Sequence, residues 1–276
     1  MIIFQMSDST SYHRAIEVDN FSGLDNIRII LCEPQGPLNI GSVARAIKGM
    51  GINDLWLVNP IEFLNQKETW YMAHGAQDII QNCRVVENLS QALDGVHFLV
   101  GTTHRRRRRR LAEPVPAKQA AIEIASISPQ QKVAVLFGRE DKGLTNEELC
   151  RCQLTASIPM ATKNPSLNLA QAVQIMAYEI FLASSRQVET SVMEYATVDE
   201  VEAFYQRINN LVQKIQIKPI NNSWQSFMYT IRRVFSRKGL EERDIAALDM
   251  IFSTASRYIN RLETQLDSTK SDNSPK

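Results

Sequence analysis

Five short apolar runs divide the first part of the chain. They lie at 26–32, 55–58, 97–101, 132–138 and 154–158, and each holds four to seven mainly aliphatic residues bounded by Gly, Pro or Asn. Runs of this length and composition are typical of buried strands. Periodic segments at 40–50, 74–80, 89–94, 117–126 and 168–184 predict helices between and after them. This alternation predicts an α/β fold, with a parallel sheet flanked by helices and a ligand site at the carboxyl ends of the strands.

The pattern changes after residue 185, where the strand signal ends. Amphipathic segments at about 198–216, 223–236 and 240–264 predict three helices, separated at Pro219 and Gly239. We therefore expect a flexible extension at 1–24, an α/β domain at 25–186, a linker at 187–197, a small C-terminal all-helical domain at 198–265 and a disordered tail at 266–276.

Composition narrows the classes of protein that fit the chain. Its 31 Lys and Arg residues nearly balance 30 Asp and Glu, so affinity for a polyanion must come from local clusters of charge. The four cysteines form no disulfide framework, and no second ligand pair accompanies Cys150 and Cys152, so we expect reduced thiols and no metal. The N-terminus lacks a signal-peptide pattern, and no apolar run reaches about 18 residues, which favours a cytoplasmic protein that does not enter membranes.

The glycines do not form a nucleotide-binding fingerprint. Neither GxGxxG nor GxxxxGK[ST] occurs, which disfavours a Rossmann methyltransferase, an ATPase, and a nucleotidyl- or hydride-transfer enzyme. Three loops instead follow strands directly, at 101–104, 138–144 and 158–168. Glycine at the end of a strand lets a backbone approach a ligand closely, although it also serves simple turns. Three such loops at one sheet edge predict a ligand pocket.

Helix capping competes with ligand binding as an explanation for several polar residues. Thr145 and Glu148 have the spacing of a capping box that starts a short helix, which explains both without catalysis. Asn168 or Ser166 can cap the helix predicted at 168–184, and for Ser166 capping and ligand binding stay equally open and compatible. Glu140 has no such structural explanation.

A turn-rich segment runs into a helix near Asn39 and Arg45. The amides at the start of such a helix face the sheet edge and form a natural phosphate site. Arg45, on the first turns of the predicted helix, is either a solvated surface residue or a phosphate or catalytic contact.

Six consecutive arginines follow the loop at 101–104. Such a run can neutralise several phosphates, although runs of like charge are usually disordered and solvated. Its position beside the expected pocket favours a loop that faces RNA. A second basic cluster, among aromatic residues of the helical segment, is another candidate RNA surface. The predicted RNA-binding residues are Arg105, Arg106, Arg107, Arg108, Arg109, Arg110, Arg139, Arg232 and Arg233.

Three segments together resemble a known family. GPLNIGSVARAIKGMGINDLWLVNP (36–60), VLFGREDKGLTNEEL (135–149) and SIPMATKNPSLNLAQAVQIMAYE (157–179) are similar, in order, to the three motifs of the SpoU/TrmH family in the SPOUT methyltransferase superfamily. The resemblance spans about 26–185. It implies a trefoil-knotted parallel sheet, a homodimer, and S-adenosylmethionine-dependent methylation of an RNA ribose 2′-hydroxyl. Within the family, the likeness is strongest to enzymes that modify cytidine or uridine at nucleotide 32 of tRNA.

The resemblance also assigns residues. It implies cofactor contacts from Thr102, Thr103, His104, Gly138, Ile158, Ser166 and Leu167, and a catalytic region of Arg45, Asn39, Glu140, Ser166 and Asn168. The arginine run replaces a loop of mixed composition, and Pro165 stands where a small polar residue is common. Two alternatives are the same chemistry on ribosomal RNA and a non-catalytic knotted RNA-binding protein, which retention of the whole catalytic set argues against.

Overall fold

The computed structural model describes residues 23–104, 113–162, 166–185, 193–217, 219, 223–235 and 239–272, with side chains up to 265. The six-arginine run, Pro165 and nearly all of the expected N-terminal extension lie outside these ranges. Among the helices that are described, none combines the length and the apolar character needed to cross a bilayer.

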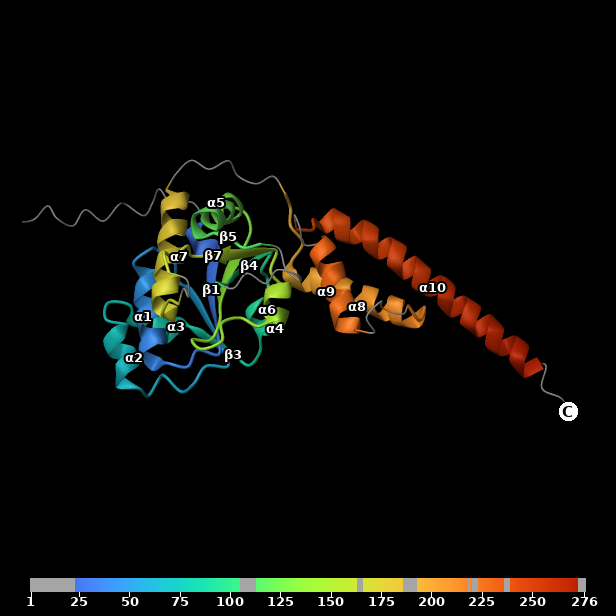
Figure 1. Cartoon of the computed structure of the whole chain (residues 1–276), viewed down its shortest axis with the longest axis horizontal. Coiled ribbons are helices and arrows are strands. Elements are labelled where there is room, and N and C mark those ends of the chain that lie inside the picture. The colour runs from blue at the N-terminus through green and yellow to red at the C-terminus, as the bar shows by residue number, and fades with distance from the viewer. Residues whose placement is uncertain are drawn as a thin grey trace, which may run out of the picture.

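A parallel sheet forms the centre of the described structure (Figure 1). Its seven described strands lie in the order β3-β2-β1-β6-β4-β7-β5, and each neighbouring pair is parallel. The strands are β1 (Ile27–Cys32), β2 (Asp54–Val58), β3 (Arg84–Val86), β4 (Phe98–Thr102), β5 (Val115–Pro116), β6 (Val133–Phe137) and β7 (Leu154–Ser157).

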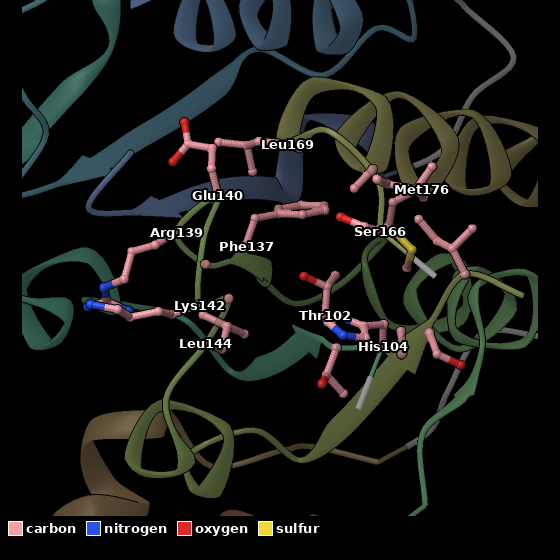
Figure 2. Close-up of a pocket in the computed structure, with 18 of the residues that line it drawn as sticks. Thr102, His104, Phe137, Arg139, Glu140, Lys142, Leu144, Ser166, Leu169 and Met176 are labelled. Atoms are coloured by element: carbon pink, nitrogen blue, oxygen red, sulfur yellow. The ribbon is translucent and has the colours of Figure 1, made fainter. Parts of the chain in front are cut away.

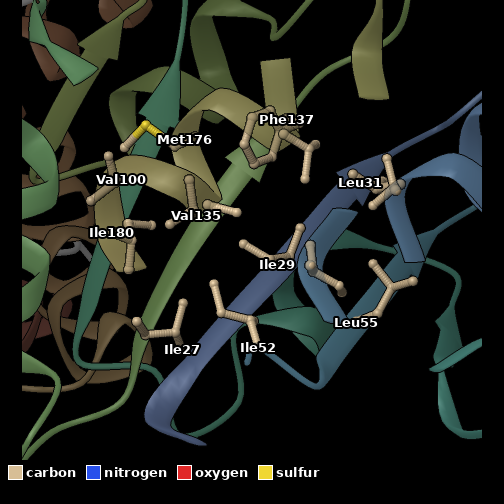
Figure 3. Packing of buried hydrophobic residues seen from close by; sticks show 14 of the residues in the cluster. Ile27, Ile29, Leu31, Ile52, Leu55, Val100, Val135, Phe137, Met176 and Ile180 are labelled. Carbon is tan, nitrogen blue, oxygen red and sulfur yellow. The ribbon is translucent and has the colours of Figure 1, made fainter. Parts of the chain in front are cut away.

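Helices cover both faces of this sheet. Figure 1 shows α1 and α7 on one side and α4 and α6 on the other. Successive residues of β1 alternate between the two layers: Ile29 and Leu31 join the core beneath α1, α5 and α7, as Figure 3 shows, whereas Ile30 and Cys32 face α4 and α6. The helices are α1 (Pro37–Lys48), α2 (Lys67–Met72), α3 (Gln77–Asn82), α4 (Leu89–Ala92), α5 (Ala117–Ile127), α6 (Asn146–Cys150) and α7 (Leu169–Ser184).

The five predicted strands are confirmed, and two edge strands were missed. β3 has only three residues, two of them exposed, and β5 has two residues and contains Pro116. Short edge strands bury little apolar surface, and proline is confined to such edges, so neither segment carries an apolar run. The short helix α2 was also missed.

The start of α1 differs from the prediction in a way that bears on Arg45. The helix begins at Pro37 and not near residue 40, because proline is favoured at the first helical position. Arg45 therefore lies in the last turn of α1 and not in its first turns. The prediction that it lies on the first turns of the helix is wrong, whereas its phosphate or catalytic contact stays a prediction.

Three further helices follow: α8 (Val198–Lys214), α9 (Trp224–Phe235) and α10 (Glu242–Asp272). They share a core of their own around Phe204, Tyr205 and Ile208, and Figure 1 shows α10 extending away from the sheet. The prediction of a disordered tail from residue 266 is wrong up to Asp272, because α10 continues to that residue. No Gly or Pro interrupts the segment between Leu240 and Asp272.

The end of the predicted linker, at 193–197, is packed against the α/β domain. The Tyr195 ring lies 5.3 Å from that of Phe98, and the Tyr195 backbone exchanges two hydrogen bonds with the Gln131 side chain. The Ala196 amide donates to the carbonyl of Leu240, at the start of the α10 segment. These contacts join the three C-terminal helices to the sheet.

Candidate functional site

A cavity of about 170 Å³ opens at the carboxyl ends of β4, β6 and β7 (Figure 2). The three loops predicted from the sequence all contribute to it, together with the first half of α7. Its lining consists of Thr102, Thr103, His104, Phe137, Gly138, Arg139, Glu140, Asp141, Lys142, Gly143, Leu144, Ala156, Ser157, Ile158, Met160, Ser166, Leu167, Leu169, Ala172 and Met176. The structure thus brings all seven predicted cofactor-binding residues to one cavity.

Sequence reasoning missed part of the apolar lining. Phe137 and Met176 lie in segments predicted as a strand and a helix, and neither was predicted to line the pocket. The one available signal was that Phe137 is the last residue of a strand that leads into a predicted site loop.

The loop after β6 needs glycine at position 138 because of its own fold. A Cβ there would lie 2.1 Å from the carbonyl carbon of Gly143 and 2.2 Å from the amide nitrogen of Leu144. The loop turns back on itself, with the Gly143 amide donating to the carbonyl of Arg139 at 2.8 Å and Gly143 at φ +66°. Gly138 thus accommodates the backbone of Gly143 and Leu144 in its own loop, and its predicted contact with the cofactor stays a prediction.

A hydrogen-bond network joins three loops at the mouth of the cavity. Asn39 Nδ2 donates to Glu140 Oε1 at 2.8 Å, and Asn168 Nδ2 donates to Asn39 Oδ1 at 2.8 Å. The backbone amide of Gln35 also donates to Glu140 Oε2, at 3.0 Å. The structure therefore brings together three of the five residues predicted to be catalytic, and Glu140 orders the segment that leads into α1.

The capping alternatives are resolved. Asn168 caps α7, because its side chain accepts from the amide of Ala170 and the Gln171 side chain accepts from the Asn168 amide. Ser166 is not the cap and lies exposed at the cavity, so its role as a ligand contact stays a prediction. The capping box of Thr145 and Glu148 is confirmed at the start of α6.

Arg45 stands apart from the other predicted catalytic residues. Its side chain is exposed on α1, does not line the cavity, and has no hydrogen bond or ion pair with any other described residue. As far as the described residues go, its guanidinium is thus available to a further partner.

Arg139 is held by two carboxylates, which leaves no free edge for a phosphate. Its guanidinium pairs with both Glu33 oxygens at 2.6 and 2.9 Å, and Nη1 lies 3.0 Å from each Glu148 oxygen. The hydrogen bonds to Glu33 raise the pKa of Arg139, and the same contact lowers the pKa of Glu33. We therefore revise its predicted RNA-binding role.

The two predicted RNA-binding residues on α9 differ. Arg232 pairs with both oxygens of Glu202 and stacks over the ring of Tyr205 at 4.4 Å, so it stabilises the contact between α9 and α8. Burial raises the pKa of Tyr205 to about 12. Arg233 is exposed and has no partner among the described side chains. Of the two, only Arg233 keeps a predicted RNA contact.

The cysteines are free thiols. Cys32 and Cys152 are buried, and burial raises the pKa of each well above the ordinary thiol value. In the parts of the chain that the structure describes, no three His, Cys, Asp or Glu residues gather where they could bind a metal ion.

The fold and the cavity define a helix-covered parallel α/β protein whose ligand site is built from three loops at the carboxyl edge. Residues 26–178 match the model of the SpoU rRNA Methylase family, and the chain belongs to this family. It is 39% identical over 241 residues to tRNA (cytidine/uridine-2′-O-)-methyltransferase TrmJ of Pectobacterium atrosepticum, an alignment that covers 85% of this chain and 98% of the relative.

Two solved structures are also similar. TrmJ from Z. mobilis ZM4 superposes with a TM-score of 0.72 at 28% identity, covering 83% of this chain and 98% of the other. A probable methylase family protein from Haemophilus influenzae Rd KW20 superposes with a TM-score of 0.55 at 32% identity, covering 87% and 99%.

S-adenosylmethionine is the methyl donor of this family, and the cavity suits it. The lining combines large apolar side chains, such as Phe137, Leu144 and Met176, with hydroxyl groups of Thr102 and Ser157. A purine ring can pack against the first set, while hydroxyl and backbone groups can bind the polar parts of a nucleoside.

Proposed function

We propose that this protein transfers a methyl group from S-adenosylmethionine to a ribose 2′-hydroxyl of tRNA, at nucleotide 32 of the anticodon loop. Membership of a methylase family and the names of the curated relatives support methyl transfer to tRNA. The observation that carries the proposal is the network of Asn39, Glu140 and Asn168, because it joins three of the residues predicted to be catalytic beside the cavity.

The reaction is an in-line displacement, which dictates what the side chains must do. S-adenosylmethionine would supply the methyl group as its sulfonium centre becomes a thioether, and the ribose hydroxyl that accepts the methyl group would lose its proton to a phosphate oxygen or water. Such a step depends on holding both partners in line. Asn39, Glu140 and Asn168 hold the loops in register, and Ser166, exposed at the cavity, positions ribose or cofactor.

Arg45 acts as an electrostatic group and not as a base. A guanidinium has a pKa above about 12 and stays charged at neutral pH. Its role is to hold the adjacent phosphate and to stabilise the negative charge that develops on the ribose oxygen. Its exposure and lack of a partner within the described chain fit a group that meets RNA.

A homodimer explains why Arg45 lies outside the cavity of its own chain. The face formed by α1 and α7 exposes Leu38 and Tyr178, about half of each side chain, beside a groove between the two helices. We propose that two copies meet at this face, so that Arg45 of one protomer reaches the cavity of the other. A two-fold dimer would cover this same face on both copies.

The proposal includes the trefoil knot and the RNA surface. Strand β4 lies between β6 and β7, and the loops after β6 and β7 converge on one cavity, an arrangement that a knotted crossing would produce. The six-arginine run and the helical segment at 198–265, where Arg233 is exposed, would bind the RNA, and the protein would act in the cytoplasm.

The test is to incubate the purified protein with methyl-labelled S-adenosylmethionine and unmodified tRNA, digest the RNA, and map the methylated nucleoside. Label at the first nucleotide of the anticodon loop is the expected result. Label elsewhere, or in ribosomal RNA alone, keeps the chemistry and rejects the substrate. Cofactor binding without label in any RNA favours the non-catalytic RNA-binding protein.

A further inference from the structure

Two neighbouring residues of the loop after β6 anchor it on different sides. Glu140 accepts hydrogen bonds from the segment that leads into α1, whereas Arg139 pairs with Glu33 and Glu148. Figure 2 shows the Arg139 side chain directed away from the cavity, with Glu140 leaving the loop in another direction. The loop that borders the cavity is thus fastened at both residues.

The contacts of Arg139 form a closed clamp. Its side chain is only 12% exposed and that of Glu148 13%, and the three groups make four hydrogen bonds of 3.0 Å or less. A guanidinium presents two edges in fixed geometry, so it can join two carboxylates that a lysine ammonium could not hold in the same way. Glu33, at φ 46°, adopts a backbone conformation that non-glycine residues rarely take. The clamp therefore joins the end of β1, the cavity loop and the start of α6.

Glu148 extends this clamp to the C-terminal helices. It also accepts from the Thr145 amide at 2.7 Å and so begins α6. From the same short helix, Glu147 accepts from Gln225 of α9 at 3.1 Å.

Its C-cap, Arg151, lies 3.9 Å from Glu202 of α8. Glu202 in turn pairs with Arg232 of α9. The short helix α6, whose first turn is held by Arg139 through Glu148, thus also contacts α9 through Glu147 and α8 through Arg151.

We infer that Arg139 is a positioning residue that fixes the cofactor loop and, through α6, couples cofactor binding to RNA binding by α8 and α9. This inference rests on the proposed function, in which those helices bind RNA. If the loop and the helices move as one body, cofactor in the cavity raises the affinity for tRNA. By the reciprocity of binding free energies, tRNA then raises the affinity for the cofactor by the same factor.

The test compares the wild-type chain with Arg139→Gln and Arg139→Lys. Calorimetric titration gives the dissociation constant of S-adenosylmethionine, and filter binding gives that of tRNA with and without the cofactor. Arg84→Gln is the matched control, since it removes one positive charge from an exposed arginine on the edge strand β3. All four proteins are first checked for a cooperative melt.

In Arg139→Gln we expect S-adenosylmethionine to bind about tenfold more weakly. The ratio of the tRNA affinity with cofactor to the tRNA affinity without it should fall towards one. Without cofactor, tRNA affinity and its salt dependence should match the wild type, because Arg139 contacts no RNA. Arg139→Lys should recover only part of the loss, and Arg84→Gln should behave as the wild type.

Three results would overturn the inference. Unchanged cofactor affinity and coupling, with only a lower melting temperature, would make the clamp merely structural. A flattened salt dependence of tRNA binding in Arg139→Gln would make Arg139 an RNA contact. If Arg139→Gln binds the cofactor more weakly but the cofactor still raises its tRNA affinity by the wild-type factor, α6 does not couple the two sites.

Two further situations are distinguishable. If Arg139→Gln does not fold, Glu33→Gln opens the clamp at its more exposed carboxylate, 45% exposed, and is held to the same expectations. If the wild type binds cofactor and tRNA but methylates no RNA, the proposed function fails, while the dissociation constants still decide the role of Arg139.

Discussion

Asn168 donates a hydrogen bond from its side-chain amide to Oδ1 of Asn39, although the two residues are 129 positions apart. Asn39 in turn donates to Glu140. Both the oxygen and the nitrogen of the Asn39 amide are therefore engaged, so reversing the amide would break both bonds and a carboxylate there could not donate to Glu140.

Asn39→Asp should consequently impair both stability and turnover. The aspartate can still accept from Asn168, but it cannot donate to Glu140 and adds a like charge beside it. We expect a loss of about 1–3 kcal/mol in the free energy of unfolding, measured by urea denaturation, and a fall in kcat. Asn65→Asp is the control, because Asn65 makes a similar bond to Glu62 in an exposed loop. Equal losses in the two variants would contradict the special role of Asn39.

Arg45→Ala should abolish methyl transfer while leaving the fold and cofactor binding intact. The side chain is exposed and unpaired within the described chain, so its removal should change the free energy of unfolding by no more than about 0.5 kcal/mol. Single-turnover kinetics and calorimetry measure the two properties separately. Lys48→Ala, one turn further along α1, is the control and should retain activity. Loss of cofactor binding together with activity would reject the assigned role.

Arg28→Ala should destabilise the protein without altering the chemistry of the folded fraction. Arg28 is 5% exposed near the amino end of β1, pairs with Asp54 at 2.9 Å and donates to the carbonyl of Ala92 at 2.7 Å. Its removal leaves the carboxylate of Asp54, 26% exposed, and the buried carbonyl of Ala92 without this donor, which costs about 1–3 kcal/mol. Urea denaturation should show that loss, and kcat per folded molecule should be unchanged. Lys132→Ala is the control, since Lys132 approaches the same Asp54 only at 3.8 Å.

His97 should make stability fall at mildly acidic pH. Its Nδ1 is buried and has no hydrogen-bond partner among the described residues, and burial lowers its pKa below the ordinary value of 6.5, against the attraction of Glu200 and Glu242. The unfolded state therefore binds the proton more readily, so the free energy of unfolding declines as pH falls below about 6.5. His97→Gln should flatten this dependence in denaturation curves recorded across pH, whereas His74→Gln, at an exposed turn, should not. An identical pH dependence in His97→Gln and the wild type would reject the assignment.

Replacement of the six arginines at 105–110 by serine and glycine should weaken tRNA binding and reduce its dependence on salt. Each phosphate contact that is lost removes one set of released counterions. Binding measured over a series of salt concentrations gives the slope directly. A variant with the wild-type slope would show that this run makes no phosphate contacts.

The sequence was sufficient wherever a signal is local. Apolar runs located β1, β2, β4, β6 and β7, and spacing alone identified the capping box at Thr145. These features depend on residues only a few positions apart, whose periodicity and side-chain chemistry decide the outcome. The same logic placed three loops at one edge, because the carboxyl ends of parallel strands lie together.

Only the tertiary structure decided what the polar side chains of those loops do. Glu140 meets Asn39 across 101 positions, and Arg139 meets Glu33 across 106. Pairs of residues so far apart produce no periodic pattern in the sequence. The sequence therefore could not show that Arg139 is held by Glu33 and Glu148, or that Arg45 lies away from the cavity of its own chain. Local pattern determines which elements form, whereas the pairing of buried and half-buried charges is set by which distant loops the fold brings within hydrogen-bond distance.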